Sequence, residues 1–113
     1  MAENDIRSTM TRRGFVYSYH YVGSTRKPTI LFLHGFPSTH QDWASQMTYF
    51  SDKGYGVIAL DLLGYGGTSA PDDVSQYKVL HMTGDIIDVL NDLGIDKSLA
   101  LRMWNFLVFR LIV

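Results

Sequence analysis

Two stretches of the sequence decide the fold: residues 29–43, TILFLHGFPSTHQDW, and residues 56–71, GVIALDLLGYGGTSAP. Each opens with a short apolar run without polar alternation, which is typical of a strand buried on both faces of a parallel sheet. Each run is followed by a loop that contains glycine. The sequence therefore predicts two parallel strands, Thr29–Leu33 and Gly56–Asp61, whose following loops lie at one edge of the sheet, where ligands bind in such folds.

A helix is predicted after each of the two loops. The first covers residues 39–53, with Ser38 or Thr39 as its N-cap and Gly54 at its end. Its apolar stripe at i, i+4 and i+7 is Trp43, Met47 and Phe50.

The second helix is predicted over residues 76–93 and ends at Gly94. One face carries its apolar residues: Val79, Met82, Ile86, Val89, Leu90 and Leu93. Three acids lie off that stripe, and we interpret them as a solvated face: Asp85, Asp88 and Asp92.

The flanking segments complete an α/β pattern. A short strand near residues 6–12 and a second over residues 15–22, FVYSYHYV, form a hairpin with its corner at Arg13-Gly14. A further strand is predicted from Ser98 onward. We expect one domain over residues 1–113, with an N-terminal β-hairpin followed by a parallel βαβαβ unit.

Composition excludes several classes of function. The chain has 113 residues, 46% of them hydrophobic, and a net charge of −1, which argues for a globular unit without the basic field of a nucleic-acid binder. It has no cysteine, so thiolate metal sites and cysteine nucleophiles are excluded. The first 13 residues are polar and lack a signal-peptide core, which predicts a cytoplasmic location.

The last 16 residues differ from the rest. Of residues 98–113, 12 are apolar and the charged ones are Arg102 and Arg110. This run is shorter than the roughly 18 to 20 apolar residues of a membrane span, so we expect no span but a buried strand running into a helix. The incomplete sheet would leave a bare strand edge, through which the chain could associate with itself.

The motifs resemble a known family. LFLHGFPSTHQDW followed by VIALDLLGYGGTSAP is similar to the N-terminal part of α/β-hydrolases, and HGFP with GYGGTSAP resembles the epoxide-hydrolase-like branch. The resemblance spans residues 13–97 and leaves 98–113 as a divergent tail. It implies a partial α/β-hydrolase fold with an incomplete sheet. In the complete family enzyme it implies hydrolysis of an epoxide, ester or carbon–halogen bond of a small molecule, without a cofactor or metal.

The resemblance also implies roles for single residues. An oxyanion-hole turn would be formed by His34, Gly35, Phe36 and Pro37, with the backbone N–H of Phe36 as one donor. The cleft would be lined, without reacting, by Asp61, Gly64, Tyr65 and Gly66. Leu63 stands where an arginine is common in the wider family.

The nucleophile of that family is missing. Its Ser or Asp lies on a G-x-[SD]-x-G turn after the next strand. No two of the ten glycines are four positions apart, so these 113 residues hold no such turn and we assign no catalytic residue. Either Trp104 survives from a Gly-His-Asp-Trp-Gly turn, or residues 98–113 are not family sequence. We expect no turnover from this chain alone; the alternative is a non-catalytic product that pairs with itself or with a full-length relative.

Other candidate sites are weaker. His34, His40 and His81 are more simply packed or solvated imidazoles than bases. The spacing of His34, His40 and Asp42 matches no zinc motif, and residues 64–67 lack the spacing of a phosphate-binding loop. Tyr65 could contact substrate, although packing is the simpler interpretation.

Overall fold

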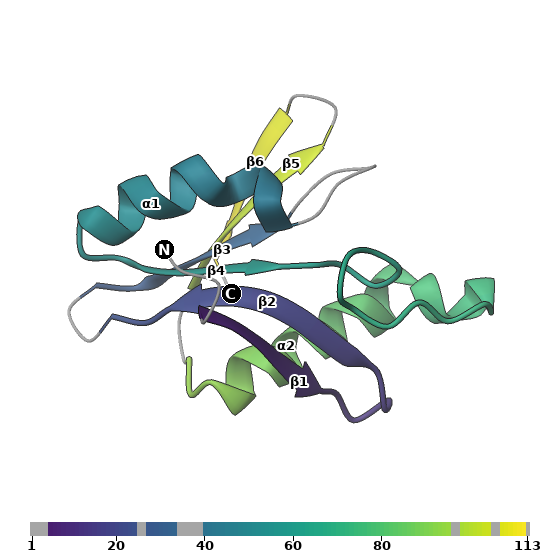
Figure 1. The fold of residues 1–113 in the computed structure, drawn as a ribbon. Coiled ribbons are helices and arrows are strands. Elements are labelled where there is room, and N and C mark those ends of the chain that lie inside the picture. Colours follow the sequence, from purple (N-terminus) through teal and green to yellow (C-terminus); the bar gives the residue numbers. More distant parts are fainter. Residues whose placement is uncertain (1–4, 25–26, 34–39, 96–97, 105–106, 113) are drawn as a thin grey trace.

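The computed structural model describes residues 5–24, 27–33, 40–95, 98–104 and 107–112 (Figure 1). They form one mixed six-stranded sheet with the strand order β1-β2-β4-β3-β5-β6. The strands are β1 (Ile6–Met10), β2 (Val16–Val22), β3 (Thr29–Leu33), β4 (Gly56–Leu60), β5 (Ser98–Trp104) and β6 (Leu107–Ile112).

The three central strands are parallel. Strand β3 pairs with β4 on one side and with β5 on the other, so that Leu33 lies level with both Leu60 and Arg102. The loops that follow these strands therefore start from the same edge of the sheet, as the sequence predicted.

The N-terminal hairpin is confirmed. Strands β1 and β2 pair antiparallel, and β2 in turn pairs antiparallel with β4. The turn between them is closed by the N–H of Gly14, which donates to the carbonyl of Thr11 at 2.9 Å. Gly14 has a φ of 85°, a backbone conformation that other residues rarely adopt.

Both predicted helices are present, but each begins later than expected. Helix α1 (Ala44–Asp52) follows the 3₁₀ turn η2 (His40–Trp43), and α2 (Val79–Asp92) follows the 3₁₀ turn η3 (Val74–Tyr77). The predicted caps Ser38 and Thr39 lie outside the described residues. Val79 does not belong to the buried stripe, because at the first turn of α2 its side chain is exposed to solvent.

The two helices cover opposite faces of the sheet (Figure 1). Successive residues of a strand point to opposite faces, so the unbroken apolar runs of β3 and β4 serve two cores. The core under α1 is Ile30, Phe32, Trp43, Met47, Val57 and Ala59. The core under α2 is Tyr17, Tyr19, Leu31, Ile58, Leu60, Leu63, Val89 and Leu90.

The C-terminal segment is the main departure from expectation. Residues 107–112 form strand β6 instead of a helix, paired antiparallel with β5 from Leu99↔Ile112 to Trp104↔Leu107. The segment LVFRLI is rich in β-branched and aromatic residues, and as a strand it satisfies the backbone groups along the outer edge of β5. The bare edge at this end of the sheet is therefore that of β6.

Candidate active site

The candidate site lies at the edge where β3, β4 and β5 end. The sequence HGFP begins directly after the last residue of β3, Leu33. His34, Gly35, Phe36 and Pro37 lie outside the described residues, so their role as an oxyanion-hole turn stays a prediction. The site is therefore built from the loop after β4 and its supports.

Asp61 anchors the loop after β4. Asp61 is buried, and its carboxylate Oδ2 accepts a hydrogen bond from the backbone N–H of Gly67 at 3.0 Å. Its own N–H donates to the carbonyl of Ser18 at 2.9 Å. The carboxylate of Asp61 therefore fixes the backbone of the loop at Gly67.

Glycine is required at two positions of the loop. Gly64 and Gly66 have φ values of 90° and 50°, so both lie in the left-handed region. A Cβ on Gly66 would collide with the carboxylate of Asp61, and one on Gly64 would press against the ring of Tyr77 at 3.0 Å. These glycines let the loop fold over Asp61 and under Tyr77.

Beyond the end of β4, the loop forms hydrogen bonds with β2. The N–H of Ser69 donates to the carbonyl of Val16 at 2.8 Å, and the N–H of Val16 donates back to Ser69 Oγ at 2.9 Å. Thr68 Oγ1 accepts the N–H of Ser18 at 2.9 Å and donates to the carbonyl of Asp61 at 2.6 Å. The hydroxyls of Thr68 and Ser69 thus accept the N–H groups of Ser18 and Val16 in β2, in place of backbone carbonyls of the loop.

Two loop residues differ in their surroundings. Leu63, at the position where an arginine is common in the wider family, is fully buried in the core under α2. Tyr65 is half-buried in a tight turn, with its N–H donating to the carbonyl of Leu62 at 2.9 Å. The assignment of Asp61, Gly64, Tyr65 and Gly66 as cleft-lining residues stays a prediction.

The end of β5 is where the family's nucleophile would lie. Arg102 is level with Leu33 at the carboxyl end of β3, yet β5 continues to Trp104 and the chain returns as β6. A nucleophile elbow needs a strand, a sharp turn and a helix. Here the next described element after β5 is the antiparallel strand β6, in place of that helix.

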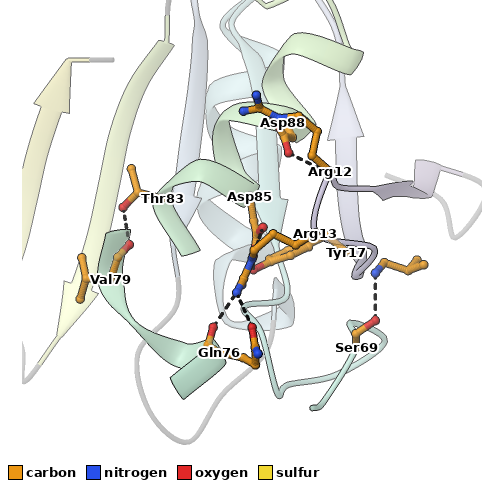
Figure 2. Close-up of polar contacts among 10 residues, drawn as sticks. Arg12, Arg13, Tyr17, Ser69, Gln76, Val79, Thr83, Asp85 and Asp88 are labelled. Carbon is orange, nitrogen blue, oxygen red and sulfur yellow. Dashed lines mark hydrogen bonds and ion pairs between the residues drawn. The ribbon is translucent and has the colours of Figure 1, made fainter. Parts of the chain in front are cut away.

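An ion-paired cluster that joins the hairpin, η3 and α2 was missed by the sequence analysis. Asp85 is 1% exposed, and its carboxylate accepts hydrogen bonds from Arg13 Nε at 2.9 Å and Nη2 at 2.6 Å (Figure 2). Tyr17 Oη donates to the same carboxylate at 2.7 Å. Arg13 also donates to the side chain and the carbonyl of Gln76, at 3.0 and 3.1 Å.

The cluster sets the protonation of its members. Burial favours the neutral form of Asp85, but hydrogen bonds from Arg13 and Tyr17 outweigh it and lower the pKa of the carboxyl below its ordinary value. Burial, and then the hydrogen bond to Asp85, raises the pKa of Tyr17 well above its ordinary value. The cluster is therefore a carboxylate, a guanidinium and a neutral phenol at neutral pH.

The other two acids of α2 also contact the hairpin. Asp88 accepts the backbone N–H and the Nε of Arg12 at 3.0 and 2.9 Å (Figure 2). Asp92 accepts the hydroxyl of Thr9 at 2.8 Å. The interpretation of these acids as a solvated face is thus wrong for Asp85 and incomplete for the others. Their i, i+3, i+7 spacing, with two arginines at the hairpin corner, was the available signal.

In the ranges that the structure describes, no three His, Asp or Glu side chains gather as metal ligands. His81 is exposed on α2, as the sequence suggested. Within the same described residues, no helix is long and apolar enough to cross a membrane.

Comparison with known proteins identifies the class. Residues 28–101 match the family model of the alpha/beta hydrolase fold, and the chain belongs to this family. Among curated relatives, it is 38% identical to epoxide hydrolase 1 of Siraitia grosvenorii over 109 residues, which is 91% of this chain and 34% of the relative. It is 40% identical to an epoxide hydrolase of Caballeronia sordidicola, over 82% of this chain and 30% of the relative.

A solved structure agrees with this assignment. The crystal structure of an epoxide hydrolase from Vigna radiata superposes with a TM-score of 0.80 and 33% identity, covering 90% of this chain and 32% of that one. The resemblance to epoxide hydrolases predicted from the motifs is confirmed. The chain spans about a third of the length of these relatives.

Proposed function

We propose that this chain supplies the amino-terminal part of an epoxide-hydrolase-like reaction pocket, and that the 113 residues alone do not turn substrate over. The observation that carries the proposal is the anchored loop after β4, which leaves the sheet where Leu60 lies level with Leu33, the last residue of β3. Two such loops form one side of a pocket at the carboxyl edge of a parallel sheet.

The chemistry assigned to these residues is electrostatic. When a nucleophile opens an epoxide or attacks an ester, negative charge develops on the substrate oxygen, and a backbone N–H aimed at that oxygen stabilises the transition state. We assign this donor to Phe36, within the turn formed by His34, Gly35, Phe36 and Pro37. We assign Asp61, Gly64, Tyr65 and Gly66 to the neighbouring wall, with Tyr65 as the candidate for contact with substrate.

The absence of a nucleophile explains the proposed lack of turnover. The sequence contains no G-x-[SD]-x-G turn, and the described backbone after β5 forms a hairpin instead of an elbow. Removal of the nucleophile typically lowers the rate by several orders of magnitude. The chain therefore contributes residues that would bind substrate but no nucleophile that would react with it.

A chimera tests the positive part of the proposal. Residues 1–97 are joined to the segment of the Siraitia grosvenorii relative that follows the position aligned with Lys97, and hydrolysis of aryl and alkyl epoxides is measured. We expect turnover from the chimera and none from the 113-residue chain. The same chimera with its grafted nucleophile replaced is the control for contaminating host enzymes. A folded but inactive chimera would contradict the proposed pocket.

A second candidate function rests on the edge of β6. This strand ends the sheet, and residues 98–113 hold no acidic residue to discourage pairing. We propose as the alternative that the chain associates with itself, or with a full-length relative, through this edge. A sizing column distinguishes the two, because a monodisperse monomer at micromolar concentration would eliminate the self-pairing alternative.

A further inference from the structure

The loop after β4, residues 61–69, is held from two sides, and both supports lead back to Asp85. One side is strand β2 of the hairpin, and the other is the 3₁₀ turn η3 that precedes α2. Figure 2 shows the side chains between them, with Arg13 directed toward both Asp85 and Gln76. Asp85 supports the loop through these two elements, by way of Tyr17 and Arg13.

On the hairpin side the support is Tyr17. This residue lies between Val16 and Ser18, the two residues of β2 whose backbone groups bond Ser69, Thr68 and Asp61. Successive side chains of a strand point to opposite faces of the sheet, and the side chain of Tyr17 points to the face covered by α2. The backbone groups of Val16 and Ser18, on either side of it, bond the loop. Its hydroxyl bond to Asp85 fixes this stretch of β2 against the helix.

On the other side the support is Arg13. Its guanidinium bonds Asp85 and also the side chain and carbonyl of Gln76 in η3. The next residue, Tyr77, donates its hydroxyl to the carbonyl of Pro71 at 2.8 Å and packs against Gly64. Arg13 therefore ties the turn that covers the loop to the same buried carboxylate.

We propose that Arg13, Tyr17 and Asp85 are positioning residues for the reaction pocket, which hold loop 61–69 by fixing β2 and η3 to α2. The geometry gives the cluster this role because Val16 and Ser18 of β2 bond Asp61, Thr68 and Ser69 of the loop. On the other side, the ring of Tyr77 in η3 packs against Gly64. The significance for catalysis rests on the proposed function, whereas the mechanical support of the loop does not.

Amide hydrogen exchange on the whole chain tests the support. Tyr17→Phe removes only the hydroxyl bonded to Asp85, and Tyr19→Phe on the same strand is the matched control, because it removes a buried hydroxyl bonded to Thr9 at 2.8 Å. Exchange at Gly67 and Ser69 is compared with exchange at Ile58 in β4, which reports global opening. We expect Tyr17→Phe to speed exchange at both loop amides about tenfold relative to Ile58, by loss of one hydrogen bond to a charged group.

The control and a second variant complete the test. Tyr19→Phe is expected to change loop and core amides in equal proportion. Should Tyr17→Phe unfold the chain, Gln76→Ala keeps the buried ion pair and removes the side-chain bond between Arg13 and η3. This variant is expected to speed exchange at Gly64 relative to Ile58. Loop amides that change no more than Ile58 in the folded variants would overturn the proposal. An inactive chimera combined with faster loop exchange would reject the pocket and leave the support standing.

Discussion

Arg13 and Asp85 form a bidentate ion pair, with Nε to Oδ1 at 2.9 Å and Nη2 to Oδ2 at 2.6 Å, although they are 72 positions apart in the sequence. The arginine comes from the corner of the N-terminal hairpin and the acid from the middle of α2. The pair joins the first segment of the described chain to the helix beneath the sheet. A planar guanidinium suits this geometry, whereas a lysine could not make both bonds.

Loss of the acid should destabilise the chain strongly. Asp85→Asn leaves the guanidinium of Arg13 partly buried without a counter-charge, which costs about 3 to 5 kcal/mol. The matched variant Asp88→Asn breaks a pair whose arginine side chain is 83% exposed, and its effect should stay below about 1 kcal/mol. Urea denaturation followed by circular dichroism measures both. Equal losses would show that the buried pair contributes no more than the surface pair.

Stability should fall in acid because of Asp85. Its pKa is lowered in the folded chain, so the folded state favours the carboxylate. This contribution is complete above the unfolded value of about 3.9 and is lost as the pH falls through the lower folded value. The free energy of unfolding is measured between pH 7 and pH 2. The decline below about pH 4 should be smaller in Asp85→Asn, and a parallel decline in both proteins would contradict this assignment.

Two glycine substitutions should have opposite effects. Gly66→Ala places a side chain at a φ of 50° and against the carboxylate of Asp61, which should destabilise the chain by at least about 2 kcal/mol. Gly84→Ala lies within α2 with no atom near the added methyl, and should stabilise the chain by up to about 1 kcal/mol. Thermal unfolding measures both. A neutral Gly66→Ala would mean that the loop does not need its tight approach to Asp61.

Self-association should depend on the last strand. Leu111→Lys introduces a charge into β6, and lysine on an edge strand opposes pairing with another chain. If the chain associates through this edge, sedimentation velocity should show a smaller mass for Leu111→Lys than for the unchanged chain. Ile6→Lys in β1, at the opposite edge, is the control and should leave the mass distribution unchanged. Equal masses for all three proteins would exclude pairing through β6.

The central elements could be predicted from sequence because their signals are local. The apolar runs of β3 and β4 need burial on both faces, and Gly14, Gly54 and Gly94 mark turns that only a positive φ allows. The starts of α1 and α2 were placed too early because a 3₁₀ turn, η2 or η3, precedes each helix, and helix boundaries are the least defined part of a sequence pattern.

Two features depend on contacts distant in sequence. The burial of Asp85 follows from the hairpin corner reaching α2, and no pattern within the helix itself distinguishes a solvated acid from a paired one. Strand β6 forms because β5 offers an unpaired edge, so a segment read as a helix becomes a strand in that context. The oxyanion-hole turn, by contrast, was inferred from motif resemblance and stays a prediction.

The most direct test of the account is intact-mass spectrometry of the purified 113-residue chain during incubation with a reactive aryl epoxide, with the diol product measured in the same samples. We predict an unchanged protein mass and diol formation no faster than in buffer, because the chain supplies a pocket wall and no nucleophile. A stoichiometric adduct on one side chain would contradict the account if diol also forms and substitution of that side chain abolishes diol formation.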